Sequence, residues 1–146
     1  MNDDDWDNGM FSENLYYRTL WRRKEFAGIH FEDVCRKFGG IVRRIDGTRL
    51  SDKFDIVMLD YTTATIAIIE TKSCVREDDV KKLVEEKVKN FKTIFSYYRD
   101  FKIYTGLGAE EFDDKAIEEA RKYGIGLLQQ VGETVEYAAD WEVKAY

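Results

Sequence analysis

Two apolar runs separated by a short polar break constrain the fold of this chain more than any other feature. The runs cover residues 54–59 and 66–69, and the break at residues 60–63 reads Asp-Tyr-Thr-Thr. Apolar runs of this length, bounded by polar turn residues, are typical of a β-hairpin. In a two-residue repeat, Glu70 and Lys72 share a face with the buried positions that precede them. A buried face that ends on a carboxylate and an ammonium predicts a role for both side chains beyond packing.

The size and composition of the chain are those of an ordinary globular domain. Its 146 residues are 44% hydrophobic and 36% charged. A chain of this length buries roughly two-thirds of its unfolded surface, so we expect one domain at residues 15–146 after an acidic N-terminal arm at residues 1–14. The sequence contains no run of the ~20 apolar residues that span a membrane and no signal-peptide pattern, and its two cysteines lack disulfide or zinc spacing. We therefore expect a cytoplasmic protein with no membrane partner.

Charge is distributed unevenly along the sequence, whose formal net charge is −6. Residues 1–17 hold five acids and no base (−5), residues 18–53 hold ten bases and five acids (+5), and residues 54–146 hold thirteen bases and nineteen acids (−6). A basic segment beside an acidic one can place a positive wall next to a cluster of carboxylates. The alternative is a solvated surface that is only uneven in charge.

The order of the expected elements predicts an α/β fold with a mixed central β-sheet flanked by helices. Helical spacing indicates a helix that starts at residue 15 and splits at Gly28, followed by a second helix at residues 29–37 that stops at Gly39-Gly40. Further helices are expected at residues 76–101 and 112–123, and strands at 41–45, 54–59, 66–72, 102–107 and 125–131. The first three strands are expected to form an antiparallel meander, and the later strand–helix alternation indicates parallel crossovers. The tail at residues 133–146 is expected to add an edge strand or to pack as a loop.

Asp55, Glu70 and Lys72 form the pattern Asp-x14-Glu-x-Lys across the predicted hairpin. Two neighbouring carboxylates can hold one or two Mg²⁺ (or Mn²⁺) ions, which prefer oxygen ligands and keep water molecules for a substrate phosphate. A lysine on the same face can contact a metal-bound water or the scissile phosphate, and neutralise charge that develops on phosphorus. The structural alternative is a salt-bridged group at the rim of the sheet.

Two further Glu-x-Lys patterns lack this context. Glu85-Glu86-Lys87 lies within an expected helix, where residues two apart do not face each other. Glu142-Val143-Lys144 has no acid-bearing partner strand before it and no helix after it. Only Glu70-Thr71-Lys72 ends a buried strand, pairs with a strand that carries an acid and precedes a long helix. We take it as the candidate site.

In residues 31–131 the sequence resembles the PD-(D/E)XK nuclease superfamily, whose members have the restriction-endonuclease-like fold. The matching segments are FEDV at residues 31–34, FDIV at 54–57 and IIETKS at 68–73; YGIGLL at 123–128 is similar to the last helix–strand corner of small uncharacterised bacterial nuclease-like domains. The resemblance implies an α-β-β-β-α-β-α-β core and Mg²⁺-dependent hydrolysis of phosphodiester bonds. It implies that Asp55 and Glu70 are metal ligands, that Lys72 orients or activates the attacking water, and that Glu32 is an acid of the first core helix. Phe54 stands where the family name has proline.

Four basic residues near the hairpin are candidates for phosphate contacts, which dominate nucleic-acid affinity: Arg43, Arg44, Arg49 and Lys53. Their alternative role is a charged face on an edge strand. The sequence therefore predicts a Mg²⁺-dependent nuclease that acts on DNA more readily than on RNA, with a homodimer as one way to cut two strands. The competing hypothesis is a non-catalytic nucleic-acid-binding or protein-interaction module that keeps the fold. The acidic overall balance and the acidic N-terminal arm favour this second hypothesis.

Overall fold

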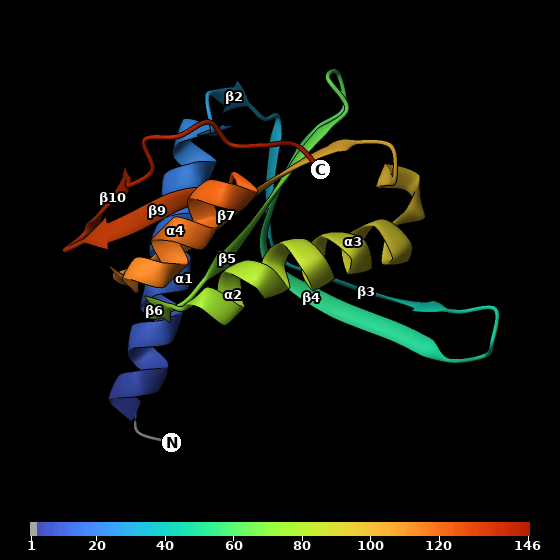
Figure 1. Cartoon of the computed structure of the whole chain (residues 1–146), viewed down its shortest axis with the longest axis horizontal. Coiled ribbons are helices and arrows are strands. Elements are labelled where there is room, and N and C mark those ends of the chain that lie inside the picture. Colours follow the sequence, from blue (N-terminus) through green and yellow to red (C-terminus); the bar gives the residue numbers. More distant parts are fainter. Residues whose placement is uncertain (1–2) are drawn as a thin grey trace.

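A six-stranded mixed sheet forms the centre of the molecule (Figure 1). The structure is a computed structural model that describes the backbone of residues 3–146 and the side chains of residues 13–146. The strand order is β10-β9-β7-β5-β4-β3. The strands are β3 (Asp33–Arg43), β4 (Arg49–Asp60), β5 (Thr65–Thr71), β7 (Lys102–Ala109), β9 (Gly126–Val131) and β10 (Thr134–Tyr137). The first three are antiparallel, β5, β7 and β9 are parallel, and β10 is antiparallel to β9. The predicted meander and parallel crossovers are confirmed, and the tail supplies an edge strand.

Helices cover both faces of this sheet. The long helix α1 (Asp3–Arg23) lies on one face, and the other face carries α2 (Glu77–Lys82), a π-helical turn (Leu83–Lys87), α3 (Val88–Ile94) and α4 (Asp114–Tyr123) (Figure 1). Each face has its own apolar core, because neighbouring residues of β5 point in opposite directions. Ile68 is buried on the α2–α4 side and Ile69 on the α1 side. The order of the core elements is α-β-β-β-α-β-α-β, as the sequence predicts.

Two small two-stranded sheets complete the secondary structure. β1 (Glu25–Phe26) pairs with β2 (Ile29–His30), and β6 (Cys74–Val75) pairs with β8 (Glu111–Phe112). A short 3-10 turn, Ser96–Tyr98, follows α3. Among the described residues, no helix combines the length and the apolar character that a membrane crossing requires.

The predicted helix at residues 29–37 is wrong, because this segment forms β2 and the first part of β3. Gly39 and Gly40, expected to stop that helix, lie inside β3. The cause is a break in strand alternation at Lys37, whose φ is +53°. On either side of this break, Cys35 and Phe38 both pack against the α2–α4 core. Two inward side chains three residues apart imitate a helical repeat, although the backbone is extended.

The ends of two other helices differ from their predicted positions. α1 begins at Asp3, so residues 3–14 of the predicted arm have a helical backbone, while residues 1 and 2 lie outside the described residues. The helix predicted at residues 76–101 begins one residue later and ends at Ile94, where Phe95 leaves helical geometry with φ −107° and ψ 67°. The aromatic residues beyond this point, Tyr98 and Phe101, pack against Tyr61 from the β4–β5 turn. Tertiary contacts between aromatic rings therefore override the apolar stripe at this end.

Candidate functional site

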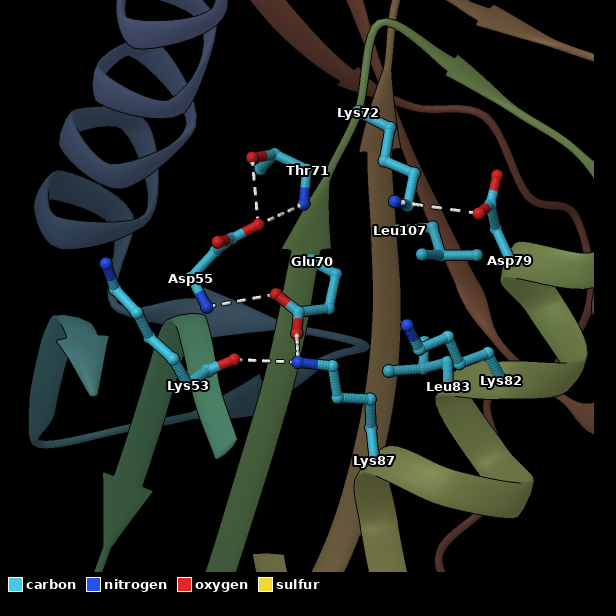
Figure 2. A pocket seen from close by; sticks show the side chains of 10 residues that line it. All are labelled: Lys53, Asp55, Glu70, Thr71, Lys72, Asp79, Lys82, Leu83, Lys87 and Leu107. Carbon is cyan, nitrogen blue, oxygen red and sulfur yellow. Dashed lines mark hydrogen bonds and ion pairs between the residues drawn. The ribbon is translucent and has the colours of Figure 1, made fainter. Parts of the chain in front are cut away.

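The candidate site lies where β4 and β5 separate. The ladder between the two strands ends at the pair Ile56 and Ile69. Beyond this pair, the backbone N–H of Asp55 donates to Glu70 Oε2 (2.9 Å), and the N–H of Thr71 donates to Asp55 Oδ2 (2.9 Å). The Thr71 hydroxyl also donates to Asp55 Oδ2 (3.2 Å). Two carboxylates thus satisfy amide groups that the diverging backbones leave unpaired. We call this reciprocal pair the carboxylate clamp (Figure 2).

A cavity of about 190 Å³ opens beside the carboxylate clamp. Leu83 from the π-helical turn and Leu107 from β7 provide apolar parts of its wall, and the rest of the lining is polar (Figure 2). The polar lining consists of Lys53, Asp55, Glu70, Thr71, Lys72, Asp79, Lys82 and Lys87. Four lysines therefore surround three carboxylates. Such a lining can hold a cation on the acids and an anion on the lysines at the same time.

Glu70 is the most buried acid of the cavity, with 8% of its surface exposed. Burial and, to a smaller extent, the nearby negative charge of Asp55 raise the pKa of Glu70 to about 7. The hydrogen bond from Asp55 N lowers this pKa, but by less than the charge of Asp55 raises it. Its atom Oε1 is buried and lies 3.0 Å from Lys87 Nζ; within the described residues no other group donates to it. The Lys87 ammonium therefore supplies the counter-charge for this oxygen.

The sequence interpretation missed Lys87, as well as Asp79 and Lys82 of the cavity lining. The Lys87 ammonium lies 2.8 Å from Asp52 Oδ1, as well as 3.0 Å from Glu70 Oε1, and donates to the backbone carbonyl of Lys53 (2.7 Å). Asn90 donates to the other oxygen of Asp52 (2.9 Å). Burial acts to lower the pKa of Lys87, but the hydrogen bond to Asp52 and the charge of Glu70 raise it above its usual value. Lys87 is therefore charged and acts as an internal counter-ion for Glu70.

A signal for Lys87 was present in the sequence. It lies four residues after Leu83 and four before Phe91, both of which are buried core residues. A lysine at that spacing falls on the apolar stripe of the helix, where an ammonium needs a buried partner. The rejection of Glu85-Glu86-Lys87 as a strand-type motif stands, since the segment is helical, but its lysine reaches the site through the π-helical turn. Such turns are frequent at functional sites.

Lys72 lines the cavity without contacting Glu70. Its ammonium lies 3.6 Å from Asp79 Oδ1, near the start of α2, and nearly half of its side chain (45%) is exposed. The other oxygen of Asp79 accepts the backbone N–H of Arg76 (2.9 Å), which fixes this carboxylate at the beginning of the helix. Figure 2 shows Lys72 and Asp79 side by side across the cavity from Asp55.

Glu32 does not reach the cavity, contrary to the expectation for an acid of the first core helix. It precedes β3 and is exposed, and its Oε1 accepts a hydrogen bond from the Thr62 hydroxyl (3.0 Å). The neighbouring Asp33 pairs with Leu59, four residues along β4 from Asp55. At about 3.4 Å per residue this separation is roughly 14 Å. The expectation depended on a helix at residues 29–37, and the extended backbone places Glu32 at the opposite end of the strands.

The four basic candidates lie along the part of β3 and β4 that extends past the cavity. Lys53 lines the cavity, and Arg43 is directly opposite Arg49 at the far end of the ladder. Arg44 lies in the connecting turn, with Nη1 3.5 Å from the Thr48 hydroxyl. All four are exposed. The three arginines therefore cluster at the outer end of the two strands, and Lys53 lies at the inner end beside the cavity.

The donor set of the carboxylate clamp fits a Mg²⁺ or Mn²⁺ ion. Glu70 Oε1 is a buried oxygen with only Lys87 beside it, and within the described residues Asp55 Oδ1 accepts no hydrogen bond. No group of three or more potential ligand residues occurs in the described part of the chain. Two carboxylates are a normal protein contribution for Mg²⁺, which keeps several waters and takes further ligands from a substrate phosphate.

Comparison with known proteins gives little information about this chain. No protein-family model matches the sequence, and no curated protein matches it. Among solved structures, the chain is similar to the small subunit of the heterodimeric restriction endonuclease R.BspD6I, with a TM-score of 0.39 and 14% identity. The match covers 82% of this chain and 61% of that subunit, so the chain spans less than two-thirds of its length. At this level of likeness, the function has to be inferred from the geometry of the chain's own residues.

Proposed function

We propose that this chain is a Mg²⁺-dependent nuclease domain that hydrolyses phosphodiester bonds of DNA. The observation that supports the proposal most is the carboxylate clamp itself. Asp55 and Glu70 meet at a lysine-lined cavity at the point where β4 and β5 diverge, and each keeps an oxygen free of hydrogen bonds. The resemblance to the PD-(D/E)XK superfamily at these same residues agrees with the chemistry of the site.

The side chains of the cavity divide into two groups by charge. Asp55 and Glu70 would hold the ion, which when bound supplies positive charge to the substrate phosphate and acidifies a water ligand. When an ion neutralises Glu70, the Lys87 ammonium keeps Asp52 and the Lys53 carbonyl as partners, so it need not leave. Lys72, with an exposed ammonium at the cavity wall, would orient the attacking water and stabilise negative charge on phosphorus.

A cleavage assay tests the assignment. Labelled single-stranded, duplex and branched DNA, with RNA for comparison, is incubated with Mg²⁺ and with EDTA. Glu70→Gln and Lys72→Ala should each slow Mg²⁺-dependent cleavage by about a hundredfold or more. Their matched controls, Glu86→Gln and Lys89→Ala, change exposed residues outside the cavity and should cut at the wild-type rate. Equal cleavage by all five proteins would assign any activity to a contaminant and overturn the proposal.

The competing function is a non-catalytic module that keeps the same fold. It is favoured because the charged groups of the site already have partners within the protein. Backbone amides bind Asp55 and Glu70, Lys87 also contacts Glu70, and Lys72 is paired with Asp79. Metal titration separates the two functions. A metal site should raise the melting temperature with increasing Mn²⁺ or Mg²⁺ by mass action. Asp55→Asn should abolish this increase, and a wild-type protein that shows no increase supports the non-catalytic module.

Cutting both strands of a duplex requires two such sites. A homodimer would supply them, and sedimentation of the protein with and without duplex DNA measures whether one forms. If the protein dimerises only in the presence of DNA, the second protomer would supply the site that cuts the second strand. A monomer under both conditions predicts nicking of one strand instead.

A further inference from the structure

The two-stranded end of the sheet projects from the body of the protein. Residues 38–43 of β3 pair with residues 49–54 of β4, whereas the ladder between β4 and β5 starts only at Ile56. We call residues 38–53 the β-ribbon arm; it lies at the lower right in Figure 1. Five ladder steps separate the pair Phe38–Phe54 from the pair Arg43–Arg49. At about 3.4 Å per residue the arm is roughly 17 Å long.

One face of the arm carries positive charge that the fold does not neutralise. Arg43 and Arg49 are directly opposite each other, and Lys53 lies on the same face four residues along β4. Like charges at opposed positions destabilise a strand pair. Within the described residues, no carboxylate lies within 4.0 Å of any of these three side chains. The arm therefore maintains an unfavourable charge pair that a polyanionic partner would relieve.

The two acids of the arm are already bound to other groups. Asp52 points to the opposite face, where it contacts Lys87 and Asn90. Asp46 accepts hydrogen bonds from the backbone N–H and the hydroxyl of Thr48 inside the turn. Neither acid neutralises the basic face.

The arm exposes two aliphatic side chains, one of them at its tip. Ile45, in the turn between the strands, has a relative exposure of 109%, and Ile41, on the basic face, has 61%. Each exposes a branched aliphatic side chain next to arginines. An exposed isoleucine at the tip, flanked by arginines, suits a partner that offers phosphates along its edges and apolar groups between them.

We propose that the β-ribbon arm enters the major groove of duplex DNA, with Arg43, Arg44 and Arg49 on the phosphates and Ile45 against the base edges. The inference rests on the proposed nuclease function and specifies its substrate as a B-form duplex. A two-stranded ribbon with side chains is about 10 Å thick, judged from the spacing of packed sheets. It fits the major groove, about 12 Å wide, but not the minor groove, about 6 Å wide. Thymine methyl groups in the major groove are apolar partners for an aliphatic side chain.

The arm also connects the groove to the candidate site. Lys53 lies at its base and lines the cavity, and its backbone carbonyl accepts a hydrogen bond from Lys87. A duplex held along the basic face would therefore run from the arm tip toward the carboxylate clamp. The phosphate chain would meet positive side chains at both ends of this path.

Binding is measured without cleavage, by fluorescence anisotropy of a labelled duplex in EDTA at several salt concentrations. Arg43→Gln combined with Arg49→Gln should lower affinity about tenfold and reduce the slope of log K against log [salt] by about 2, since each phosphate contact contributes about 0.9. Ile45→Ser should weaken binding several-fold without changing the slope, because it removes an apolar contact and no charge. The matched control, Arg22→Gln combined with Lys102→Gln, removes two exposed positive charges outside the arm, at the end of α1 and the start of β7, and should bind like the wild type.

The same anisotropy assay tests which groove the arm enters and which type of duplex it binds. Methyl green, which occupies the major groove, should displace the protein, while the minor-groove ligand distamycin should not. Duplex RNA, whose major groove is too narrow for side chains, should bind more weakly and respond equally to the arm and control variants. Arm variants that bind like the wild type, or displacement by distamycin alone, would overturn the inference.

The outcomes for the arm and for the catalytic site are independent. Arm-dependent binding with no Mg²⁺-dependent cleavage supports the arm and removes the nuclease function. Cleavage that depends on Glu70, together with binding that does not depend on the arm residues, supports the nuclease function and removes the role of the arm.

Discussion

Glu70 is the residue whose environment departs most from that of a free side chain. Its pKa is raised from 4.5 to about 7, first by burial and then by the charge of Asp55. The folded protein therefore holds the Glu70 proton more tightly than the unfolded chain does. By linkage, the contribution of Glu70 to stability is largest below pH 4.5 and falls as the pH rises toward about 7. Ionised Glu70 is retained at a cost in stability, as expected for a group with a functional role.

The first prediction follows from this decrease in stability with rising pH. In EDTA, the free energy of unfolding of the wild type should fall relative to that of Glu70→Gln between about pH 4.5 and about pH 7, by up to roughly 3 kcal/mol. Urea unfolding at several pH values measures the difference. Glu86→Gln, an exposed change on the neighbouring helix, should run parallel to the wild type. Parallel profiles for Glu70→Gln and the wild type would show that Glu70 titrates normally.

The second prediction concerns Lys87, the counter-ion of Glu70 and Asp52. Lys87→Met keeps most of the aliphatic chain but leaves two carboxylates, 10% and 16% exposed, without their shared cation. Removal of one partner from a buried ion pair destabilises strongly, so we expect a loss of about 2–4 kcal/mol. Lys81→Met on the same helical segment breaks only an exposed pair with Glu77 and should leave the free energy of unfolding nearly unchanged. Equal losses in urea unfolding would mean that Lys87 has no structural role as a counter-ion.

Sequence patterns identified these residues to different degrees. Strand periodicity correctly placed Asp55 and Glu70 beside each other, because both lie on strands next to the point where the ladder ends. Their roles as metal ligands stay predictions. Lys72 lines the same cavity, yet its ion pair with Asp79 depends on how α2 docks, which no local pattern describes. Glu32 was misplaced because its position depended on a helix that the chain does not form.

At the scale of elements, the β-ribbon arm depends on close contact with α3. A Cβ at Gly40 would lie 2.8 Å from Ile94 Cγ2 and from a ring carbon of Phe95, whereas a Cβ at Gly39 would lie no closer than 3.5 Å to any atom. We therefore predict that Gly40→Ala lowers the free energy of unfolding by about 1–2 kcal/mol through overpacking. Gly39→Ala, its neighbour on the open face, should change it by less than about 0.5 kcal/mol.

Thermal unfolding of the two variants tests this contact. A similar stability for both would show that Ile94 and Phe95 move aside freely. In that case the base of the arm would be less tightly held against the helix than the packing indicates.

The elements also show where sequence patterns are reliable. Buried runs such as β5 were predicted well, because all residues from Thr65 to Glu70 are buried and β-branched residues dominate. The first part of the edge strand β3 was mistaken for a helix, because the positive φ of Lys37 interrupts strand alternation and changes the spacing of inward residues from two to three. The π-helical turn was not predicted either, since it shifts the register of a stripe that otherwise matches an ordinary helix.

At the scale of the whole molecule, one sheet separates two apolar cores. The adjacent β5 residues Ile68 and Ile69 are both fully buried, one in each core. Because the cores share every central strand, we predict that the protein unfolds in a single transition. Ile68→Ala and Ile69→Ala should each lower the free energy of unfolding by about 2–4 kcal/mol. For each variant, circular dichroism and fluorescence should report the same loss of unfolding free energy, because both follow a single transition.

Two separate transitions in either variant would contradict this prediction. They would mean that α1 and its core unfold independently of the α2–α4 side. The predicted single domain at residues 15–146 would then consist of two units of stability.

The carboxylate clamp gives the molecule a reporter of its own. The amide protons of Asp55 and Thr71 are bonded to the two side chains that any cation or proton at the site would also contact. Their chemical shifts and hydrogen-exchange rates should therefore change when the site gains a proton or an ion. Those two signals would follow occupancy of the cavity in solution, residue by residue, without an attached probe or a known substrate.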